Sequence, residues 1–322
     1  MVEKNKKIIG IYPEESEKGI KYQAVKVIKG GWGFKVDDAN VFGASDMEQI
    51  LNNTPADLVV GVVPSQNCFQ RVINLPPIPE KRIPEVVKFE AAQQIPFDIN
   101  DVYWNWKFLT NYPEDPELKI KVAAIKKGTV EKCFPFKKVN FVTSIPESLP
   151  SLYQKPGDEK LEGILAIGKT STDIIICKNG NNYWNRLMLY GSENDEVRAD
   201  GKSDLGTDIK RTLGFWQQKD PNEKIDCLLY YPQTKVLPER LEQISNEAGI
   251  HLKLVNPYNK FENSEAITGD YLYAAAGVLA TENAVNLMGN NKYKFKKRKT
   301  QKEPFIWKIG KAIENLGKSL QR

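Results

Sequence analysis

Residues Gly163 to Thr170, within the stretch GILAIGKTST, match the spacing G-x-x-x-x-G-K-[ST] of a phosphate-binding loop. In such a loop, backbone N–H groups and the N-terminus of a following helix hold the phosphates of a nucleotide. That chemistry requires an open glycine-rich loop with a strand before it and a helix after it.

The neighbours of this motif predict a different structure. Residues Ile164 to Ile167, between the two glycines, form an apolar run typical of a buried strand. After Thr172, the stretch DIIICKNG predicts a second strand that ends at an Asn-Gly turn. The sequence therefore predicts a β-hairpin with a polar turn over residues 168–172, which disfavours a Walker-type nucleotide hydrolase.

Histidine and cysteine chemistry is also disfavoured. The chain of 322 residues has one histidine, His251, in a predicted strand, and its four cysteines form no C-x-x-C pair. Scattered cysteines of this kind are typical of buried, reduced thiols in a cytoplasmic protein. We therefore expect no metal site, no disulfide and no histidine-based catalysis. The cysteines are Cys68, Cys133, Cys177 and Cys227.

Charge divides the chain into an acidic body and a basic tail. The net charge is +5, yet residues 292–322 hold eleven Lys or Arg against two Glu. The tail thus carries +9, and residues 1–291 carry −4 of the total. No apolar run approaches the roughly 20 residues that cross a bilayer, and the N-terminus lacks the apolar core of a signal peptide.

Strands and helices alternate in both halves of the chain, which predicts an α/β protein with two similar lobes. In the first half, strands are expected within residues 6–15, 20–43, 57–65, 68–79 and 101–109, a helix within 79–95, and a strand followed by a helix within 119–136. After a linker at 153–162 and the hairpin, we expect helices within 203–219, 237–249 and 269–281 and strands within 224–232 and 250–257.

One segment resembles the pilus assembly proteins of the PilM type. It runs from a strand ending in Leu-Pro-Pro, through a helix that carries Glu90, to Ile95, Pro96 and Phe97. The stretches KVAAIKKGTVEKC, ILAIGKTSTDIII and LGTDIKRTLGFWQQ resemble later parts of that family in the same order. The resemblance covers most of residues 8–288. These proteins are actin-like relatives of the cell-division protein FtsA and of the cytoplasmic domain of the type II secretion protein GspL.

The resemblance implies a two-lobed actin-like (RNase H-like) α/β fold. We expect a first lobe over residues 1–155, with an inserted subdomain at about 65–145. A second lobe would follow over 156–290, and a basic amphipathic tail would occupy 291–322.

Three departures from the family pattern fall where an actin-like protein holds its nucleotide. Tyr12 and Ala166 stand where the two phosphate hairpins typically carry Asp. Tyr231, Pro232 and Gln233 stand where consecutive glycines would let the backbone approach adenosine. Without the two carboxylates, Mg²⁺ would lack its oxygen ligands in this family's site.

These departures imply a pseudo-ATPase with no catalytic residue, cofactor or metal. ATP and Mg²⁺ are disfavoured because Glu14 and Glu15, beside the first predicted turn, would repel a triphosphate. Residual nucleotide binding through Gly168, Lys169 and Thr170 stays open. The alternative of the same fold is an active actin-like ATPase.

By resemblance, the chain is a non-catalytic cytoplasmic scaffold, peripheral to the inner membrane, in a type IV pilus or type II secretion platform. Its implied partners are the cytoplasmic segment of a PilN-like or GspM-like membrane protein and a motor ATPase. The expected partner surface comprises Glu90, Ile95, Pro96 and Phe97. Alternatively, Ile95, Pro96 and Phe97 end the helix and fill the core.

The tail offers a third role, as a membrane-surface adaptor. Its apolar helical face, which includes Phe305 and Ile309 with Trp307 beside it, suits either anionic lipid or packing on protein, and packing is the commoner role of such a stripe. The segment resembles the part of GspL-type proteins that approaches the membrane, but no transmembrane helix follows it. Nucleic acid is not an expected partner, because the body is acidic. The basic cluster of the tail comprises Lys292, Lys294, Lys296, Lys297, Arg298 and Lys299.

Overall fold

The structure is a computed structural model that describes residues 5–16, 19–31, 33–110, 117–155, 159–194, 204–219, 221, 223–231 and 238–289. The chain forms two compact units, residues 1–290 and 291–322. The second unit lies outside the described residues, and so do the predicted basic cluster and Trp307. Pro232 and Gln233 lie outside them too.

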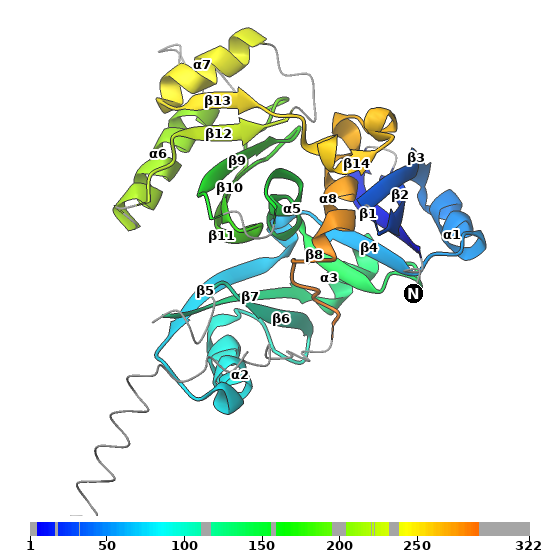
Figure 1. Cartoon of the computed structure of the whole chain (residues 1–322), viewed down its shortest axis with the longest axis horizontal. Coiled ribbons are helices and arrows are strands. Elements are labelled where there is room, and N and C mark those ends of the chain that lie inside the picture. The colour runs from blue at the N-terminus through cyan, green and yellow to red at the C-terminus, as the bar shows by residue number, and fades with distance from the viewer. Residues whose placement is uncertain are drawn as a thin grey trace, which may run out of the picture. The chain divides into compact units, whose positions relative to one another are not determined.

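Two sheets with the same strand order form the framework of the first unit (Figure 1). In the first sheet, β1, β2 and β3 make an antiparallel meander, and β4 and β8 follow on the other side of β1, parallel to it. The short strand β14 extends the sheet beside β3. The strands are β1 (Lys6–Ser16), β2 (Gly19–Gly30), β3 (Gly33–Gly43), β4 (Leu58–Val63), β8 (Phe141–Ser144) and β14 (Phe261–Glu262).

The second sheet repeats this order. Its antiparallel meander is β9, β10 and β11, and β12 and β13 follow parallel to β9. The repeat makes the two lobes topological copies of one another, in agreement with the predicted two-lobed actin-like fold. The strands are β9 (Glu162–Ile167), β10 (Thr172–Lys178), β11 (Asn181–Met188), β12 (Cys227–Tyr230) and β13 (His251–Leu254).

Between β4 and β8 the chain forms an inserted subdomain, an antiparallel sheet of order β5-β7-β6 with α2 on one face (Figure 1). Helix α2 has Pro84 in its first turn, as its missing N–H allows. The helix ends where the N–H of Ile95 donates to the carbonyl of Ala91 at 2.9 Å, ahead of Pro96. The elements are β5 (Phe69–Leu75), α2 (Ile83–Gln94), β6 (Val102–Phe108) and β7 (Leu118–Lys126).

A layer of helices lies between the two main sheets (Figure 1). Helix α8 is buried along its whole length and packs directly on β1. Gly10 makes this approach possible, because a Cβ there would lie 2.1 Å from the carbonyl oxygen of Ala274. The core around α8 includes Val60 from the first sheet and Ile164 from the second. The helices of this layer are α4 (Ile145–Ser148), α5 (Pro150–Tyr153) and α8 (Leu272–Ala280).

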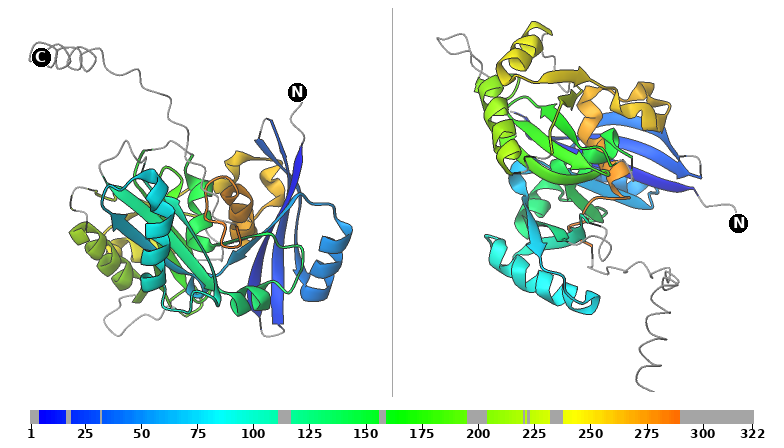
Figure 2. Two further views of the ribbon diagram at one scale, coloured as in Figure 1. Left: turned by 90° about the horizontal axis from the view of Figure 1, so that it is seen from below. Right: turned by 60° about the vertical axis from the view of Figure 1, so that its left-hand side comes forward.

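Further helices cover the outer faces of the sheets (Figure 2). Because side chains alternate along β9, Leu165 and Ile167 join the core under α6 and α7, whereas Ile164 and Ala166 face α8. Burial on both faces explains the unbroken apolar run that the sequence shows here. The helices are α1 (Ala44–Asn53) and α3 (Lys127–Cys133) on the first sheet, and α6 (Asp204–Lys219) and α7 (Pro238–Ala248) on the second. Short 3₁₀ segments are Ser65–Asn67, Glu80–Arg82, Pro257–Lys260, Ser264–Ala266 and Gly269–Tyr271.

Helices α2, α3, α6, α7 and α8 lie where the sequence predicts them, but α1, α4 and α5 have no counterpart in the prediction. No helix in the described part of the chain is both long and apolar enough to cross a membrane.

A buried ionic cluster joins the inserted subdomain to the rest of the first unit. Oε2 of Glu147, on α4, lies 2.9 Å from Nζ of Lys107 on β6, and Oε1 lies 3.7 Å from Nζ of Lys121 on β7. Asn182, on β11 of the second lobe, donates to Glu147 at 3.3 Å and to Gln70 of β5 at 2.9 Å. We call Lys107, Lys121 and Glu147 the junction cluster.

Burial disfavours the charged forms of the residues in the junction cluster. The attraction between the carboxylate and the two ammonium groups opposes this effect of burial. Burial works against ionisation of Glu147, but Lys107 and Lys121 outweigh it and hold the pKa of this carboxyl below its usual value. Burial also lowers the pKa of Lys121 to about 8, with Glu147 acting in the opposite direction. The cluster therefore depends on the carboxylate of Glu147.

Candidate functional site between the lobes

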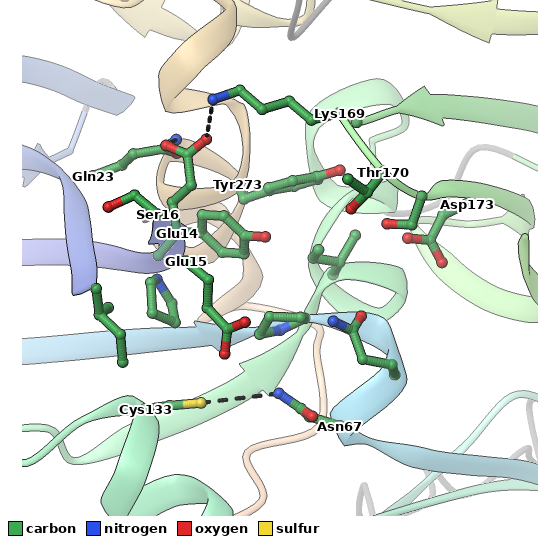
Figure 3. A pocket seen from close by; sticks show the side chains of 18 of the residues that line it. Glu14, Glu15, Ser16, Gln23, Asn67, Cys133, Lys169, Thr170, Asp173 and Tyr273 are labelled. Carbon is green, nitrogen blue, oxygen red and sulfur yellow. Dashed lines mark hydrogen bonds and ion pairs between the residues drawn. The ribbon is translucent and has the colours of Figure 1, made fainter. Parts of the chain in front are cut away.

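A pocket of about 960 Å³ lies between the two lobes (Figure 3). The β1–β2 hairpin of the first lobe forms one wall, and the turn between β9 and β10 forms the opposite wall. Residues of α3, the segment after β4 and the start of α8 complete the lining. The pocket therefore lies where the two topologically equivalent hairpins face each other.

The first hairpin brings an aromatic ring and a carboxylate to the pocket. Pairing of β1 with β2 continues to Ser16 opposite Gly19, so the hairpin is long. Tyr12 and Glu14 both line the pocket, two positions apart on the same face of β1. The ring centre of Tyr12 lies 4.7 Å from that of Tyr273 on α8. Burial, assisted by nearby carboxylates, raises the pKa of Tyr12, so its hydroxyl is neutral.

The second hairpin confirms the strand–turn–strand structure that the sequence predicts around the GKTS motif. Strand β9 ends at Ile167, which pairs with Thr172 at the start of β10. The N–H of Gly168 donates to the carbonyl of Ser171 at 2.9 Å and closes the turn. Because a strand follows the turn in the place of a helix, this segment is not a Walker phosphate loop.

The loop after β11 holds this turn in position. The N–H of Ser192 donates to the carbonyl of Gly168 at 2.9 Å, and that of Glu193 donates to the carbonyl of Lys169 at 2.8 Å. Gly191 is required there, because a Cβ would lie 2.5 Å from the carbonyl oxygen of Gly168. Two carbonyls of the turn are thus engaged by the protein's own backbone.

An ion pair links the two hairpins across the pocket (Figure 3). Nζ of Lys169 lies 3.0 Å from Oε1 of Glu14, and Gln23 also donates to this glutamate at 3.2 Å. The hydrogen bond and charge of Glu14 raise the pKa of Lys169, with smaller contributions from Glu193 and Asp270. Lys169, a candidate phosphate ligand from the sequence, therefore contacts a carboxylate.

Asp173, on β10, is an ionisable pocket residue that no motif in the sequence marks as functional. Its residue exposure is 2%, and its Oδ2 accepts a hydrogen bond from the hydroxyl of Ser65 at 2.7 Å. Among the described residues, Oδ1 has no hydrogen-bond partner. Burial raises the pKa of Asp173 to about 7, and the bond from Ser65 acts against this shift. The one feature of the sequence that could have indicated Asp173 is its position as a carboxylate at the start of the apolar run DIIIC.

Carboxylates outnumber ammonium groups in the described lining. Its lysines are Lys132 and Lys169, and each pairs with a glutamate, Lys132 with Glu15 at 4.0 Å. The carboxylates are Glu14, Glu15, Asp173, Glu193 and Asp270. The negative charge of a triphosphate would be repelled by this excess of carboxylates. In the part of the chain that the structure describes, no three His, Cys, Asp or Glu side chains gather into a metal site.

Two other departures from the family pattern, Ala166 and Tyr231, belong to or pack against the core between the lobes. Ala166 is 2% exposed, belongs to the core between the lobes and pairs with Asp173 across β9 and β10. The ring of Tyr231 lies 5.1 Å from that of Tyr258, at the edge of the same core. Neither Ala166 nor Tyr231 is among the described residues that line the pocket.

The residues of the predicted partner surface lie in different environments. Ile95 is 5% exposed, so it fills the core and cannot form part of an exposed surface. Glu90 and Phe97 are half-buried, and Pro96 is exposed. The prediction of an exposed surface is therefore wrong for Ile95.

A larger apolar side chain is exposed next to these positions. Phe89 on α2, which is not among the predicted partner residues, is 64% exposed. Nζ of Lys126 lies over the ring of Phe97, 4.6 Å from the ring centre. Among the described residues of the inserted subdomain, Phe89 is thus the large apolar side chain that is exposed, and Pro96, just after α2, is exposed as well.

No protein-family model matches the sequence, and no curated protein matches it. Among solved structures, the chain is similar to the PilM-PilN type IV pilus biogenesis complex, with a TM-score of 0.64 and 17% identity over 88% of this chain and 99% of that chain. It is also similar to the cytoplasmic domain of EpsL, an inner membrane component of the type II secretion system of Vibrio cholerae, with a TM-score of 0.49 and 10% identity over 88% of this chain and 98% of that chain. A Bacteroides thetaiotaomicron protein with an actin-like ATPase fold and unknown function gives a TM-score of 0.45 and 10% identity over 84% of this chain and 96% of that chain. The first similarity confirms the predicted resemblance to PilM at the level of the fold.

Proposed function

We propose that this chain is a non-catalytic scaffold of an inner-membrane assembly platform that serves a type IV pilus or type II secretion machine. The fold shared with a chain of the PilM-PilN complex supports the assignment to a pilus or secretion machine. The excess of carboxylates in the pocket supports the absence of catalysis. The scaffold acts on the cytoplasmic side and is peripheral to the inner membrane. It links the platform to its motor ATPase.

The ion pair between Glu14 and Lys169 carries the non-catalytic part of this proposal. Lys169 is the lysine of the GKTS motif, and its ammonium group lies 3.0 Å from a carboxylate of the opposite hairpin. A bound triphosphate would have to replace Glu14 at Lys169 and would meet the remaining carboxylates of the lining. The protein's own side chains thus provide the interaction that a phosphate would make.

Titration of Mg·ATP into the purified protein tests this part. We expect no heat and no shift in melting temperature at millimolar ATP. A ligand present at 100 times its Kd would stabilise the fold by about 2.7 kcal/mol, so binding would be visible as a shift. Binding to the natural protein that is lost in Lys169→Met would contradict the proposal.

A nucleotide-binding actin-like ATPase is the second candidate function, and the place of the pocket favours it. The pocket of about 960 Å³ lies between two equivalent hairpins and is large enough for a nucleotide. The same titration decides between the two functions. ATP hydrolysis that Lys169→Met abolishes would favour the enzyme.

We propose that the partner is the cytoplasmic segment of a PilN-like or GspM-like membrane protein, and that it contacts the exposed face of α2. The ring of Phe89 is 64% exposed, and exposed aromatic rings are frequent anchors of protein–protein contacts. Pro96, exposed at the end of α2, extends this surface.

A peptide with the sequence of that cytoplasmic segment, taken from the PilN-like protein of the same genome, tests the surface by fluorescence anisotropy. Phe89→Ala should weaken binding at least tenfold. Phe215→Ala is the matched control, because Phe215 is 55% exposed on the second lobe, and it should change the Kd less than twofold. Equal effects of the two substitutions would exclude α2 as the contact.

The predicted role of the tail in membrane binding needs a separate test, because residues 291–322 lie outside the described part. Cosedimentation with anionic liposomes compares the full chain with residues 1–290, which form a compact unit of their own. Equal binding by the two would contradict a membrane-surface adaptor.

A further inference from the structure

The pocket between the lobes contains a buried hydrogen-bond acceptor that lacks a donor. Asp173 is 2% exposed and lines the pocket, and within the described residues its Oδ1 accepts no hydrogen bond. An unpaired buried polar atom costs free energy, and the cost is larger when the atom is charged. A ligand that places an N–H group in the pocket would recover part of this free energy.

The charges of the pocket favour a cation. Lys132 and Lys169 are already paired with Glu15 and Glu14, at 4.0 and 3.0 Å. Glu193 and Asp270 also line the pocket, and both contribute to the raised pKa of Lys169. These two carboxylates would therefore also attract a positive charge placed in the pocket.

Two tyrosine rings add a second kind of interaction with a cation. Tyr12 and Tyr273 line the pocket, and their ring centres are 4.7 Å apart. In Figure 3, the side chain of Tyr273 extends across the pocket toward Thr170. The face of a tyrosine ring attracts alkylammonium and guanidinium groups, and the attraction is stronger when water is excluded.

We propose that this pocket binds an organic cation, an alkylammonium or guanidinium group, with Asp173 as its hydrogen-bond acceptor. The cation belongs either to a free polyamine or to a lysine or arginine side chain of a partner segment. A metal ion is a poorer match, because no metal-ligand cluster is present among the described residues. The inference rests on the proposed function in one respect, that Mg·ATP does not take this pocket.

Isothermal titration with two probes tests the inference at pH 8, above the raised pKa of Asp173, and at 0.15 M NaCl. The probes are spermidine and a short peptide that contains two lysines and has blocked ends. We expect saturable binding of at least one probe to the full chain. Asp173→Asn should weaken that binding at least tenfold. Asp46→Asn, on α1 away from the pocket, removes the same charge and should change the Kd less than twofold.

A second variant keeps the test valid if Asp173→Asn disturbs the fold. Glu193 and Asp270 are exposed, so Glu193→Gln with Asp270→Asn removes two charges of the lining without touching the core. We expect this double variant to weaken binding about threefold to tenfold.

Each outcome is informative about one claim. Binding of spermidine alone identifies a polyamine site, and binding of the peptide alone identifies a site for a partner's side chain. No heat with either probe, or unchanged affinity in Asp173→Asn and in the double variant, would overturn the inference. Mg·ATP is titrated in parallel, and binding of ATP would overturn the proposed function whether or not a cation binds.

Discussion

Two ionic sites connect parts of the first unit, and they differ in burial. In the junction cluster, the side chains of Glu147 and Lys121 are 1% and 3% exposed. Across the pocket, those of Glu14 and Lys169 are 31% and 53% exposed. Removing one partner of a buried pair is strongly destabilising, whereas an exposed pair contributes little. The junction cluster therefore fixes the inserted subdomain, while the pair across the pocket contributes little to stability.

Glu147→Gln should produce the largest effect, because it leaves two lysines in the interior without their counter-charge. We expect a loss of about 3–5 kcal/mol in the free energy of unfolding at pH 7, measured by urea denaturation. Glu131→Gln, on the exposed side of α3, is the control and should change stability by less than about 0.5 kcal/mol. A similar small loss for Glu147→Gln would mean that the two ionic sites do not differ as burial implies.

Asp173→Asn should raise stability, and only at neutral to alkaline pH. The pKa of Asp173 rises from 3.8 to about 7 in the folded state. The folded protein thus holds this proton more tightly than the unfolded chain, so the natural protein loses stability as pH rises from about 4 to 7. An asparagine does not titrate and so avoids that loss. Since one pKa unit corresponds to about 1.4 kcal/mol, the variant should be more stable at pH 8 by at most about 4 kcal/mol.

Chemical denaturation of the natural protein and of Asp173→Asn at pH 4 and pH 8 measures this difference. The two proteins should be nearly equal at pH 4 and should diverge at pH 8. A gain of the same size at both values of pH would show that the carboxyl of Asp173 is not the titrating group.

The pair between Glu14 and Lys169 should give the smallest effect. A double-mutant cycle with Glu14→Gln and Lys169→Met should return a coupling of about 0.2–1 kcal/mol that falls at 1 M salt. The pair of Lys29 with Glu282, whose side chains are 36% and 42% exposed, is a matched control outside the pocket. Coupling well above that of the control would mean that the pocket pair holds the lobes together and is not easily displaced.

The strands and helices with strong local patterns could be predicted from the sequence. Strand β9 is an unbroken apolar run because its two faces join two cores, and β10 ends at Asn179 and Gly180, which both adopt positive φ. Helix α2 could be delimited by Pro84 and Pro96. The repeated order of elements then indicated two similar lobes.

The chemistry of the pocket, the junction cluster and the burial of Ile95 could not be predicted in the same way, because they depend on contacts between distant segments. Asp173 stands out because it is buried against Ser65, which follows a strand of the other lobe. Glu147 lies in the short segment IPES, and its two lysines come from the inserted subdomain. Ile95 follows the exposed helix positions in sequence, yet the end of α2 turns it into the core. Local patterns do not report such long-range neighbours.

The two backbone hydrogen bonds that hold the GKTS turn also allow its opening to be measured by amide hydrogen exchange. The amide hydrogens of Ser192 and Glu193 are bonded to the carbonyls of Gly168 and Lys169, so exchange with deuterated water requires the turn and the loop to separate. Their exchange rates therefore measure how often the turn is released, independently of the side chains in the pocket. A ligand that orders the turn would slow both amides, and one that binds at α2 would leave them unchanged.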